Sequence, residues 1–256
     1  MLGSGTSSGV PVIGCTCAVC TSSDPRNQRL RPGLRLDLRA GTLLVDTPVD
    51  LRQQALRFGL PRVDAVLYTH AHADHVLGLD DLRVFNWMQR EAIPAFGSPA
   101  TLADLARTFW YVFEPVQVGA AKPAIERRPV TGPFELLGRT VVPVPVLHGS
   151  LPILGFRIGG FAYLTDASEI PPASRALLDG LDTLVLAAPR REPHPTHMHL
   201  DRAIEEARVV GARRTLLTHL SHDLPHAAVS GALPRGVELA YDGLVLEFHD
   251  PDEVVR

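Results

Sequence analysis

The segment 69–75 concentrates side chains that bind metal ions. It reads Thr-His-Ala-His-Ala-Asp-His and directly follows the apolar run 63–68. Imidazole and carboxylate groups are ligands for first-row transition metals. An apolar strand that ends in such a loop places these groups at the mouth of a sheet, where α/β enzymes keep their chemistry. The loop therefore predicts a metal site, in preference to a polar surface turn that happens to hold histidines.

Three further metal-binding residues, His148, Asp166 and His219, lie within two residues of the end of a separate apolar run. Grouped by type, the residues form two sets. The first set has three imidazoles: His70, His72 and His148. The second set contains Asp74, His75 and His219, and the Asp166 carboxylate can bridge the two ions. Two divalent ions roughly 3.5–4 Å apart hold a hydroxide at neutral pH and neutralise charge on a phosphoryl or carbonyl oxygen, which predicts a dinuclear hydrolase.

All three cysteines lie in one short segment, as Cys15, Cys17 and Cys20. This spacing excludes a disulfide framework and leaves either a metal clip or reduced structural thiols. Three thiolates lack one ligand of a closed tetrahedral zinc site. His222, three residues beyond His219, is predicted to supply it, with His226 as the less favoured substitute. The alternative is a set of buried reduced thiols beside an exposed His222.

His197 lies just before a predicted helix and is not needed as a metal ligand. A free imidazole near two metal ions can protonate a departing alkoxide, so we expect a catalytic role for His197. His199 fits this position less well, and His194 is interpreted as an ordinary loop residue. Asp46 ends an apolar run and is predicted to accept a hydrogen bond from a ligand imidazole, although a helix or turn cap is a competing interpretation.

The elements that must position these residues alternate along the chain. Short apolar or alternating runs predict strands at 34–38, 42–46, 63–68, 93–96, 140–147, 154–158, 161–164, 181–188, 214–217, 237–241 and 244–248. Helical spacing predicts helices at 51–58, 77–90, 101–112 and 200–210. The last two strands are predicted to form a hairpin. Together these elements indicate an α/β protein with two sheets and helices outside them.

Length and composition favour one domain over residues 1–256. Of the 256 residues, 45% are hydrophobic, which is enough for a large core without a dividing linker. The net charge of −3 gives no general attraction to nucleic acid or anionic membranes, so the expected partner is a small molecule. We find no leader-like segment and no apolar stretch of membrane-spanning length, and we expect a soluble cytoplasmic protein.

These motifs resemble the metallo-β-lactamase superfamily, through the His-Ala-His-Ala-Asp-His segment and the later His148, Asp166 and His219. The resemblance covers nearly the whole chain and implies a four-layer αβ/βα sandwich, with two mixed sheets flanked by helices and a dinuclear site at their edge. The glycine- and serine-rich loop 3–11 and the cysteine segment 15–20 resemble the PhnP branch, phosphodiesterases of the carbon–phosphorus lyase pathway that open cyclic ribose phosphates. In the PhnP branch a strand precedes this loop, whereas here only Met1 and Leu2 precede it, and this sequence departs from the family pattern at that point.

The resemblance implies two active-site divalent ions, manganese or zinc, and one structural zinc at the cysteine segment. It also supports His197 as the proton donor, names Asp74 among the catalytic residues and implies a homodimer. The expected reaction is hydrolysis of small cyclic phosphate esters by a metal-bridging hydroxide. A transfer-RNA 3′-processing endoribonuclease is the main alternative, but the chain has no long glycine- and proline-rich insertion suited to gripping tRNA. A thioesterase or lactonase is less favoured. A non-catalytic metal- or ligand-binding protein would lack a ligand residue, and none is missing.

Overall fold

Two β-sheets form the centre of the computed structural model, which describes residues 1–115 and 121–248. The predicted domain span 1–256 therefore includes short stretches outside the described residues. The first sheet has the strand order β1 (Leu34–Leu38), β2 (Gly41–Val45), β3 (Ala65–Leu67), β4 (Ile93–Gly97) and β5 (Ile125–Pro129). Strands β1 and β2 are antiparallel, and the other neighbouring pairs in this sheet are parallel.

The second sheet has seven strands and is also mixed. Its order is β12 (Val237–Leu239), β11 (Arg214–Thr218), β10 (Thr183–Ala187), β9 (Phe161–Leu164), β8 (Leu151–Ile158), β7 (Arg139–His148) and β6 (Phe134–Leu136). The four strands from β12 to β9 are parallel, and the three pairs from β9 to β6 are antiparallel. Parallel strands bring their carboxyl ends to one edge of a sheet, so loops that follow them can share a site.

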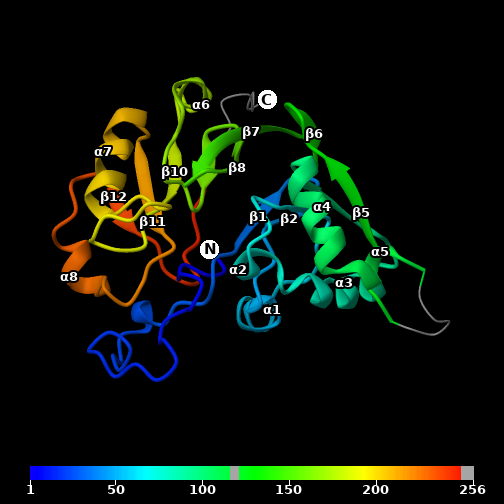
Figure 1. The fold of residues 1–256 in the computed structure, drawn as a ribbon, viewed down its shortest axis with the longest axis horizontal. Coiled ribbons are helices and arrows are strands. Elements are labelled where there is room, and N and C mark those ends of the chain that lie inside the picture. Colours follow the sequence, from blue (N-terminus) through cyan, green and yellow to red (C-terminus); the bar gives the residue numbers. More distant parts are fainter. Residues whose placement is uncertain (116–120, 249–256) are drawn as a thin grey trace.

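Helices cover the outer face of each sheet (Figure 1). The first sheet is followed or interrupted by α1 (Leu51–Phe58), α2 (Ala73–Val76), α3 (Leu82–Gln89), α4 (Pro99–Thr108) and α5 (Trp110–Phe113). The second sheet carries α6 (Pro172–Ala176), α7 (Leu200–Val210) and α8 (His226–Ser230). The described residues also form two 3-10 helices, at Pro25–Asn27 and Leu79–Asp81. No helix among the described residues is both long and apolar enough to cross a lipid bilayer.

Three apolar clusters hold these layers together. The first lies between the sheets and includes Leu43 and Leu67 on one side and Phe156 and Val185 on the other. The second packs α1, α3 and α4 onto the first sheet, and the third packs α7 onto the second sheet. The result is a helix, sheet, sheet, helix order, which confirms the predicted four-layer sandwich with two mixed sheets.

The predicted hairpin at 237–248 is wrong. Strand β12 ends at Leu239 and pairs in parallel with β11, while 244–248 forms no strand. The backbone of 243–244 instead exchanges hydrogen bonds with Met1: the Gly243 N–H donates to the Met1 carbonyl at 2.9 Å, and the Met1 amino group donates to the Leu244 carbonyl at 2.8 Å. A long-range partner thus replaces the local one.

Two predicted helices are shorter or broken. The helix predicted at 77–90 begins only at Leu82, because Gly78 leads into a 3-10 turn that packs against the chain near Pro48. A Cβ atom at Gly78 would lie 2.0 Å from the Pro48 carbonyl oxygen, so this close approach requires glycine. The helix predicted at 101–112 is interrupted at Phe109, between α4 and α5.

Candidate metal centre

Loops at strand ends bring all seven predicted metal-binding residues together. The loop after β3 and the short helix α2 carry four of them, His148 ends β7, and Asp166 and His219 follow β9 and β11. Their ligand atoms form two overlapping groups, each with all atoms within 4.8 Å of one another. One group is His70, His72, His148 and Asp166, and the other is Asp74, His75, His219 and Asp166. This is the grouping predicted from the sequence.

Asp166 presents one carboxylate oxygen to each group. Its Oδ2 atom lies 3.9 Å from the Nε2 atom of His70 and 4.0 Å from that of His148. Its Oδ1 atom lies 3.4 Å from the Nε2 atom of His75 and 3.3 Å from that of His219. A carboxylate placed in this way can bind two neighbouring ions, one through each oxygen.

The remaining two residues of the groups are His72 and Asp74, which are less buried than the other five. Asp74 directs its Oδ2 atom to the Nε2 atoms of His75 and His219, at 3.5 and 3.4 Å. The exposed His72 has its ring centroid 4.5 Å from that of His70 and 5.1 Å from that of His148. His72 and Asp74 are therefore the most accessible members of the two groups.

Hydrogen bonds on the Nδ1 side orient two of the imidazole rings. The Nδ1–H of His75 donates to Asp46 Oδ2 at 2.7 Å, and the Nδ1–H of His148 donates to the Thr196 carbonyl at 2.6 Å. These bonds set the tautomer and leave each Nε2 atom free to bind a metal. The Nε2 atoms of His70 and His75 are buried and have no hydrogen-bond partner among the described residues, which is how metal-binding nitrogens look without their ion.

Thr69 connects this orienting network. It donates from its backbone N–H to Asp46 Oδ1 at 2.9 Å and from its hydroxyl to Asp46 Oδ2 at 2.8 Å. The same hydroxyl accepts from the Nδ1–H of His70 at 3.0 Å. Sequence reasoning missed both Thr69 and Thr196. Thr69 could have been found because it stands between a strand and the first histidine, whereas the carbonyl of Thr196 is 48 residues from His148 and leaves no sequence signal.

The ionisable groups perturb one another strongly. Burial lowers the pKa of His70 well below its ordinary value, and the charge of His75 adds to the effect. Burial also lowers the pKa of His75, but the carboxylates of Asp166 and Asp46 outweigh it and hold that pKa well above its ordinary value. Burial raises the pKa of Asp166, yet His219 and His75 hold it far below its usual range. Asp166 is therefore a carboxylate, as a metal ligand must be.

Three site residues have left-handed backbone conformations that side chains other than glycine rarely adopt. Asp46, Asp166 and His219 have φ angles of 63°, 56° and 60°, and each directly follows or nearly follows a strand. Such conformations cost on the order of 1–3 kcal/mol each and concentrate at functional sites. They turn the chain sharply where β2, β9 and β11 end, which directs these side chains along the sheet edge.

His197 lies beside the two groups without belonging to either. Its ring centroid is 4.5 Å from that of His148 and 5.4 Å from that of His219. Its Nδ1 atom is buried and without a hydrogen-bond partner among the described residues, and burial lowers its pKa to about 4. His194 lies in the same loop, with its ring centroid 5.5 Å from that of His197 and its Nδ1 atom 3.1 Å from the Thr196 hydroxyl. His199 occupies the N-cap position of α7.

The cysteine segment and His222 form a separate cluster. The Sγ atoms of Cys15, Cys17 and Cys20 lie 3.3, 3.6 and 3.4 Å from the Nδ1 atom of His222. In a tetrahedral zinc site, bonds of about 2.3 Å to sulfur and about 2.0 Å to nitrogen place these atoms about 3.5 Å apart. The cluster therefore fits one zinc ion, and His226 is not among its residues.

A buried arginine fixes the loop that carries His222. The guanidinium of Arg29 donates to the carbonyls of Ser221 and Leu224, each at 2.6 Å. Arg29 is 1% exposed, and its other bonds are to residues of its own segment. Because His219 and His222 share this loop, Arg29 ties the metal centre to the cysteine segment.

Asp46→Asn tests the orienting role of the carboxylate. We expect the affinity for active-site metal to fall about 10- to 100-fold, because an amide cannot accept as strongly from His75 and disturbs its tautomer. Metal affinity is measured by competition with a chromophoric chelator. Asp37→Asn, which changes an exposed carboxylate on β1, is the matched control. Equal affinities of the two variants would contradict the role of Asp46.

Comparison with known proteins places this site in a family. Residues 42–220 match the model of the β-lactamase superfamily domain. A crystal structure described as a new diphosphatase from the PhnP family is 47% identical, with a TM-score of 0.90 and coverage of 97% of this chain and 96% of the other. An octanoyltransferase of Porphyromonas gingivalis is 39% identical over 95% of this chain, which spans about half the length of that relative.

Ribonuclease Z of Mycobacterium sp. (strain KMS) is 28% identical over 86% of this chain and 91% of its own length. The matched domain covers well over half of the chain and includes every residue of the two metal groups. The resemblance predicted from the histidine-rich loop is therefore confirmed. This chain belongs to the β-lactamase superfamily and, within it, to the PhnP-like metal-dependent hydrolases.

Proposed function

We propose that this protein is a metal-dependent phosphodiesterase that hydrolyses small cyclic phosphate esters of ribose or nucleosides. The observation that supports the proposal is the position of Asp166, whose two carboxylate oxygens lie near the two groups of proposed metal ligands. When bound, two divalent ions supply Lewis acidity and a water molecule of lowered pKa. The proposed ligands of the first ion are His70, His72, His148 and Asp166. The proposed ligands of the second are Asp74, His75, His219 and Asp166.

Other residues near the proposed metal ligands position the imidazole rings and donate a proton. Asp46, Thr69 and Thr196 hold the imidazole rings in position, so the site needs little rearrangement during the reaction. Asp74 is the least buried residue of its group, and we place the entering ester beside it. His197, next to both groups, donates a proton to the departing ribose oxygen, and it must take up that proton during the reaction because burial lowers its pKa to about 4. Its position beside the site, without a contact that would make it a ligand, supports this role.

The identity of the metal ions is also part of the proposal. Histidine and carboxylate ligands suit zinc and manganese, so we assign either of these to the active site. Three thiolates and one imidazole favour zinc, and we assign a structural zinc to Cys15, Cys17, Cys20 and His222. The distances from the three sulfur atoms to His222 support this second assignment.

A diphosphate bond is a second candidate substrate. The 47% identity with a protein described as a diphosphatase of the PhnP family favours it, because that likeness extends over nearly the full length of both chains. The chemistry at the attacked phosphorus is the same in both cases. The two candidates differ in the leaving group, which is a phosphate oxygen in a diphosphate and a ribose oxygen in a cyclic ester.

Substrate comparison tests these assignments. The purified protein, supplied with manganese or zinc, is assayed with bis-p-nitrophenyl phosphate, 2′,3′-cyclic nucleotides, a dinucleoside diphosphate and precursor tRNA. Turnover of the first two supports the proposal, and a higher kcat/KM for the diphosphate favours the second candidate. Cleavage of precursor tRNA alone would favour the activity named for the ribonuclease Z relative. An absence of turnover with every metal would overturn the enzyme assignment.

His197→Ala is expected to lower kcat by about 10²- to 10⁴-fold, because the leaving oxygen loses its proton donor. The metal content should not change, since His197 is outside both groups. The decisive comparison measures the loss of kcat with two substrates. The loss should be smaller for bis-p-nitrophenyl phosphate, whose p-nitrophenolate leaving group needs little protonation, than for a cyclic nucleotide, whose leaving group is a ribose oxygen. Equal losses for both esters would contradict proton donation. His199→Ala, at the N-cap of α7, is the control.

A further inference from the structure

The loop between β10 and α7, residues 188–199, borders the metal centre on two sides. Near its start, the Pro189 carbonyl accepts a hydrogen bond from the Ser221 N–H at 3.0 Å, in the segment that follows β11. Near its end, the Met198 N–H donates to the Ala167 carbonyl at 3.0 Å, in the segment that follows β9. Both of these segments carry proposed metal ligands. The loop is therefore placed to contact the parts of a substrate that extend beyond the metal ions.

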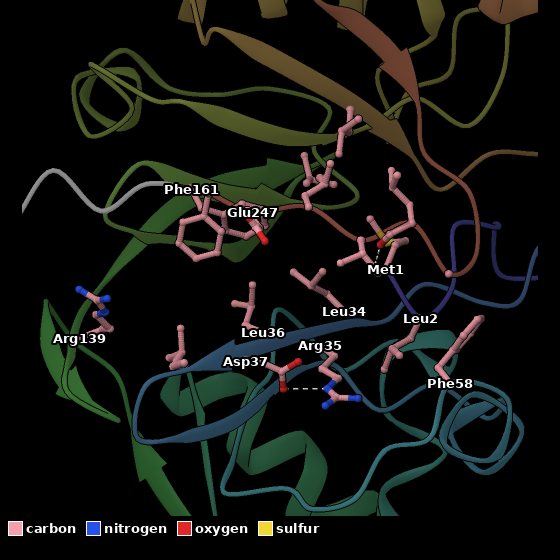
Figure 2. A pocket seen from close by; sticks show the side chains of 18 of the residues that line it. Met1, Leu2, Leu34, Arg35, Leu36, Asp37, Phe58, Arg139, Phe161 and Glu247 are labelled. Atoms are coloured by element: carbon pink, nitrogen blue, oxygen red, sulfur yellow. Dashed lines mark hydrogen bonds and ion pairs between the residues drawn. The ribbon is translucent and has the colours of Figure 1, made fainter. Parts of the chain in front are cut away.

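A groove of about 590 Å³ beside β1 is a separate feature (Figure 2). None of the proposed metal ligands lines it, and no residue of 188–199 lines it either. Apolar side chains such as Leu34 and Phe161 face its interior. Arg35, on its wall, already has a partner, because its Nε atom lies 2.8 Å from Asp37. A site for a further charged group of the substrate is therefore better sought in the loop after β10.

Arg190, in this loop, has a guanidinium group without an anionic partner. Its Nε atom is buried and has no hydrogen-bond partner, and its side chain forms no ion pair with the described residues. The backbone is fixed, since the Arg190 carbonyl accepts from the Leu200 N–H at 2.8 Å. By contrast, Arg175 on the same sheet pairs with Glu206 at 2.6 Å. A partly buried cation without a partner is unfavourable by itself, so Arg190 is suited to bind an anion.

His194 offers a second hydrogen-bond donor near Arg190. The Thr196 N–H donates to the His194 Nδ1 atom at 3.3 Å, so the ring proton is on Nε2 and this N–H is available to a ligand. Burial lowers the pKa of His194, and the nearby charges of Arg190 and His148 add to the effect. The ring centroid of His194 lies 5.5 Å from that of His197. His194 therefore lies close to Arg190 and on the His197 side of the metal centre.

The position of these two donors decides which part of a substrate they can contact. His197 is the proposed donor of a proton to the leaving oxygen, so groups beside it face the leaving group. A guanidinium binds phosphate through two parallel N–H bonds, and a neutral imidazole can add one more. A phosphate bound by Arg190 and His194 would therefore belong to the part of the substrate that departs.

We propose that Arg190 and His194 bind a second phosphate group, which the leaving group of the substrate carries while the scissile phosphate lies at the metal centre. This inference rests on the proposed function and narrows its substrates to compounds with two phosphates. A 2′,3′-cyclic nucleotide that also has a 5′-phosphate meets this requirement, and so does a diphosphate. Bis-p-nitrophenyl phosphate does not meet it, because its leaving group has no phosphate.

Binding is measured by calorimetry with the metal-loaded protein and two nucleotides, adenosine 3′-phosphate and adenosine 3′,5′-bisphosphate. Neither contains a phosphodiester, so the difference between them isolates the second phosphate without turnover. We expect the unmodified protein to bind the bisphosphate at least about tenfold more tightly, as hydrogen bonds to a charged group allow. Arg190→Gln should reduce this ratio to less than about threefold, and His194→Ala should reduce it partly. Arg191→Gln changes the exposed neighbour and should keep the ratio.

Hydrolysis provides the second measurement. For Arg190→Gln, kcat/KM should fall at least about tenfold more with 5′-phosphorylated 2′,3′-cyclic AMP or with a dinucleoside diphosphate than with bis-p-nitrophenyl phosphate. The substrate that shows the larger loss identifies where the second phosphate lies, on the sugar or in the anhydride. Equal losses with all three substrates, or equal binding of the two nucleotides by the unmodified protein, would overturn the inference and leave the proposed function intact. An absence of turnover with every metal would overturn the proposed function, and the binding ratio would still decide whether Arg190 binds phosphate.

Discussion

Asp166→Asn is expected to lower kcat/KM by at least about a thousandfold. Asparagine has nearly the same shape as aspartate, but its amide offers one oxygen instead of two and carries no charge. The two metal groups would then lose the carboxylate that they share. A loss of about 4 kcal/mol of transition-state stabilisation, the several kcal/mol that metal-ion catalysis supplies, corresponds to this factor.

Activity with bis-p-nitrophenyl phosphate and metal content by mass spectrometry are measured together. The variant should bind fewer than two active-site ions per chain while it keeps the ion of the cysteine cluster. Asp201→Asn, an exposed carboxylate on α7, is the matched control and should retain both activity and metal. A variant of Asp166 that keeps two ions and turns over within tenfold of the unmodified protein would show that the carboxylate does not bridge.

Cys20→Ser is expected to have the largest effect on stability. It removes one of the four proposed zinc ligands that join the N-terminal loop to the loop of His222, so about one zinc per chain should be lost. Loss of a structural metal is among the most damaging single changes, and we expect the free energy of unfolding to fall by about 4–5 kcal/mol. For a chain of this size, Tm should fall by about 10 °C or more.

Two further variants complete this experiment. Cys17→Ser changes a second proposed ligand of the same site. Because the Cys17 side chain is exposed, this substitution does not disturb packing in the interior. Thr16→Ser, in the same loop, is the control and should keep all ions. The active-site ions should remain in every variant. If both cysteine variants contain as much zinc as the control, the cysteines are reduced structural thiols and the structural-zinc assignment fails.

The parts of the fold that were predictable are those with a local signal. Apolar runs that end in a metal-binding residue, such as those before His70 and His219, located the strand ends, and the types of residue sorted them into two groups. The helix that ends at Phe58 was also predictable, because the next residue is Gly59 and glycine favours the left-handed conformation that closes a helix.

The parts that could not be predicted depend on distant partners. The run 244–248 looks like a strand, but its neighbour 243 bonds to Met1 at the other end of the chain. Every residue has a backbone carbonyl, so no sequence pattern shows that the carbonyl of Thr196 accepts a hydrogen bond from His148. The helix predicted at 77–90 begins late because Gly78 lies in close contact with Pro48, and the spacing of apolar residues within 77–90 does not reveal this contact.

Each of the two metal groups draws residues from both sheets. His70 and Asp74 come from the first sheet, whereas His148, Asp166 and His219 come from the second. An ion in either group therefore acts as a cross-link between the two halves of the sandwich. Because the unfolded chain does not hold the groups together, ions that bind only the folded state stabilise it by mass action. Chelation should consequently weaken the contact between the two halves, so the concentration of free metal would set the thermal stability of this protein as well as its catalytic rate.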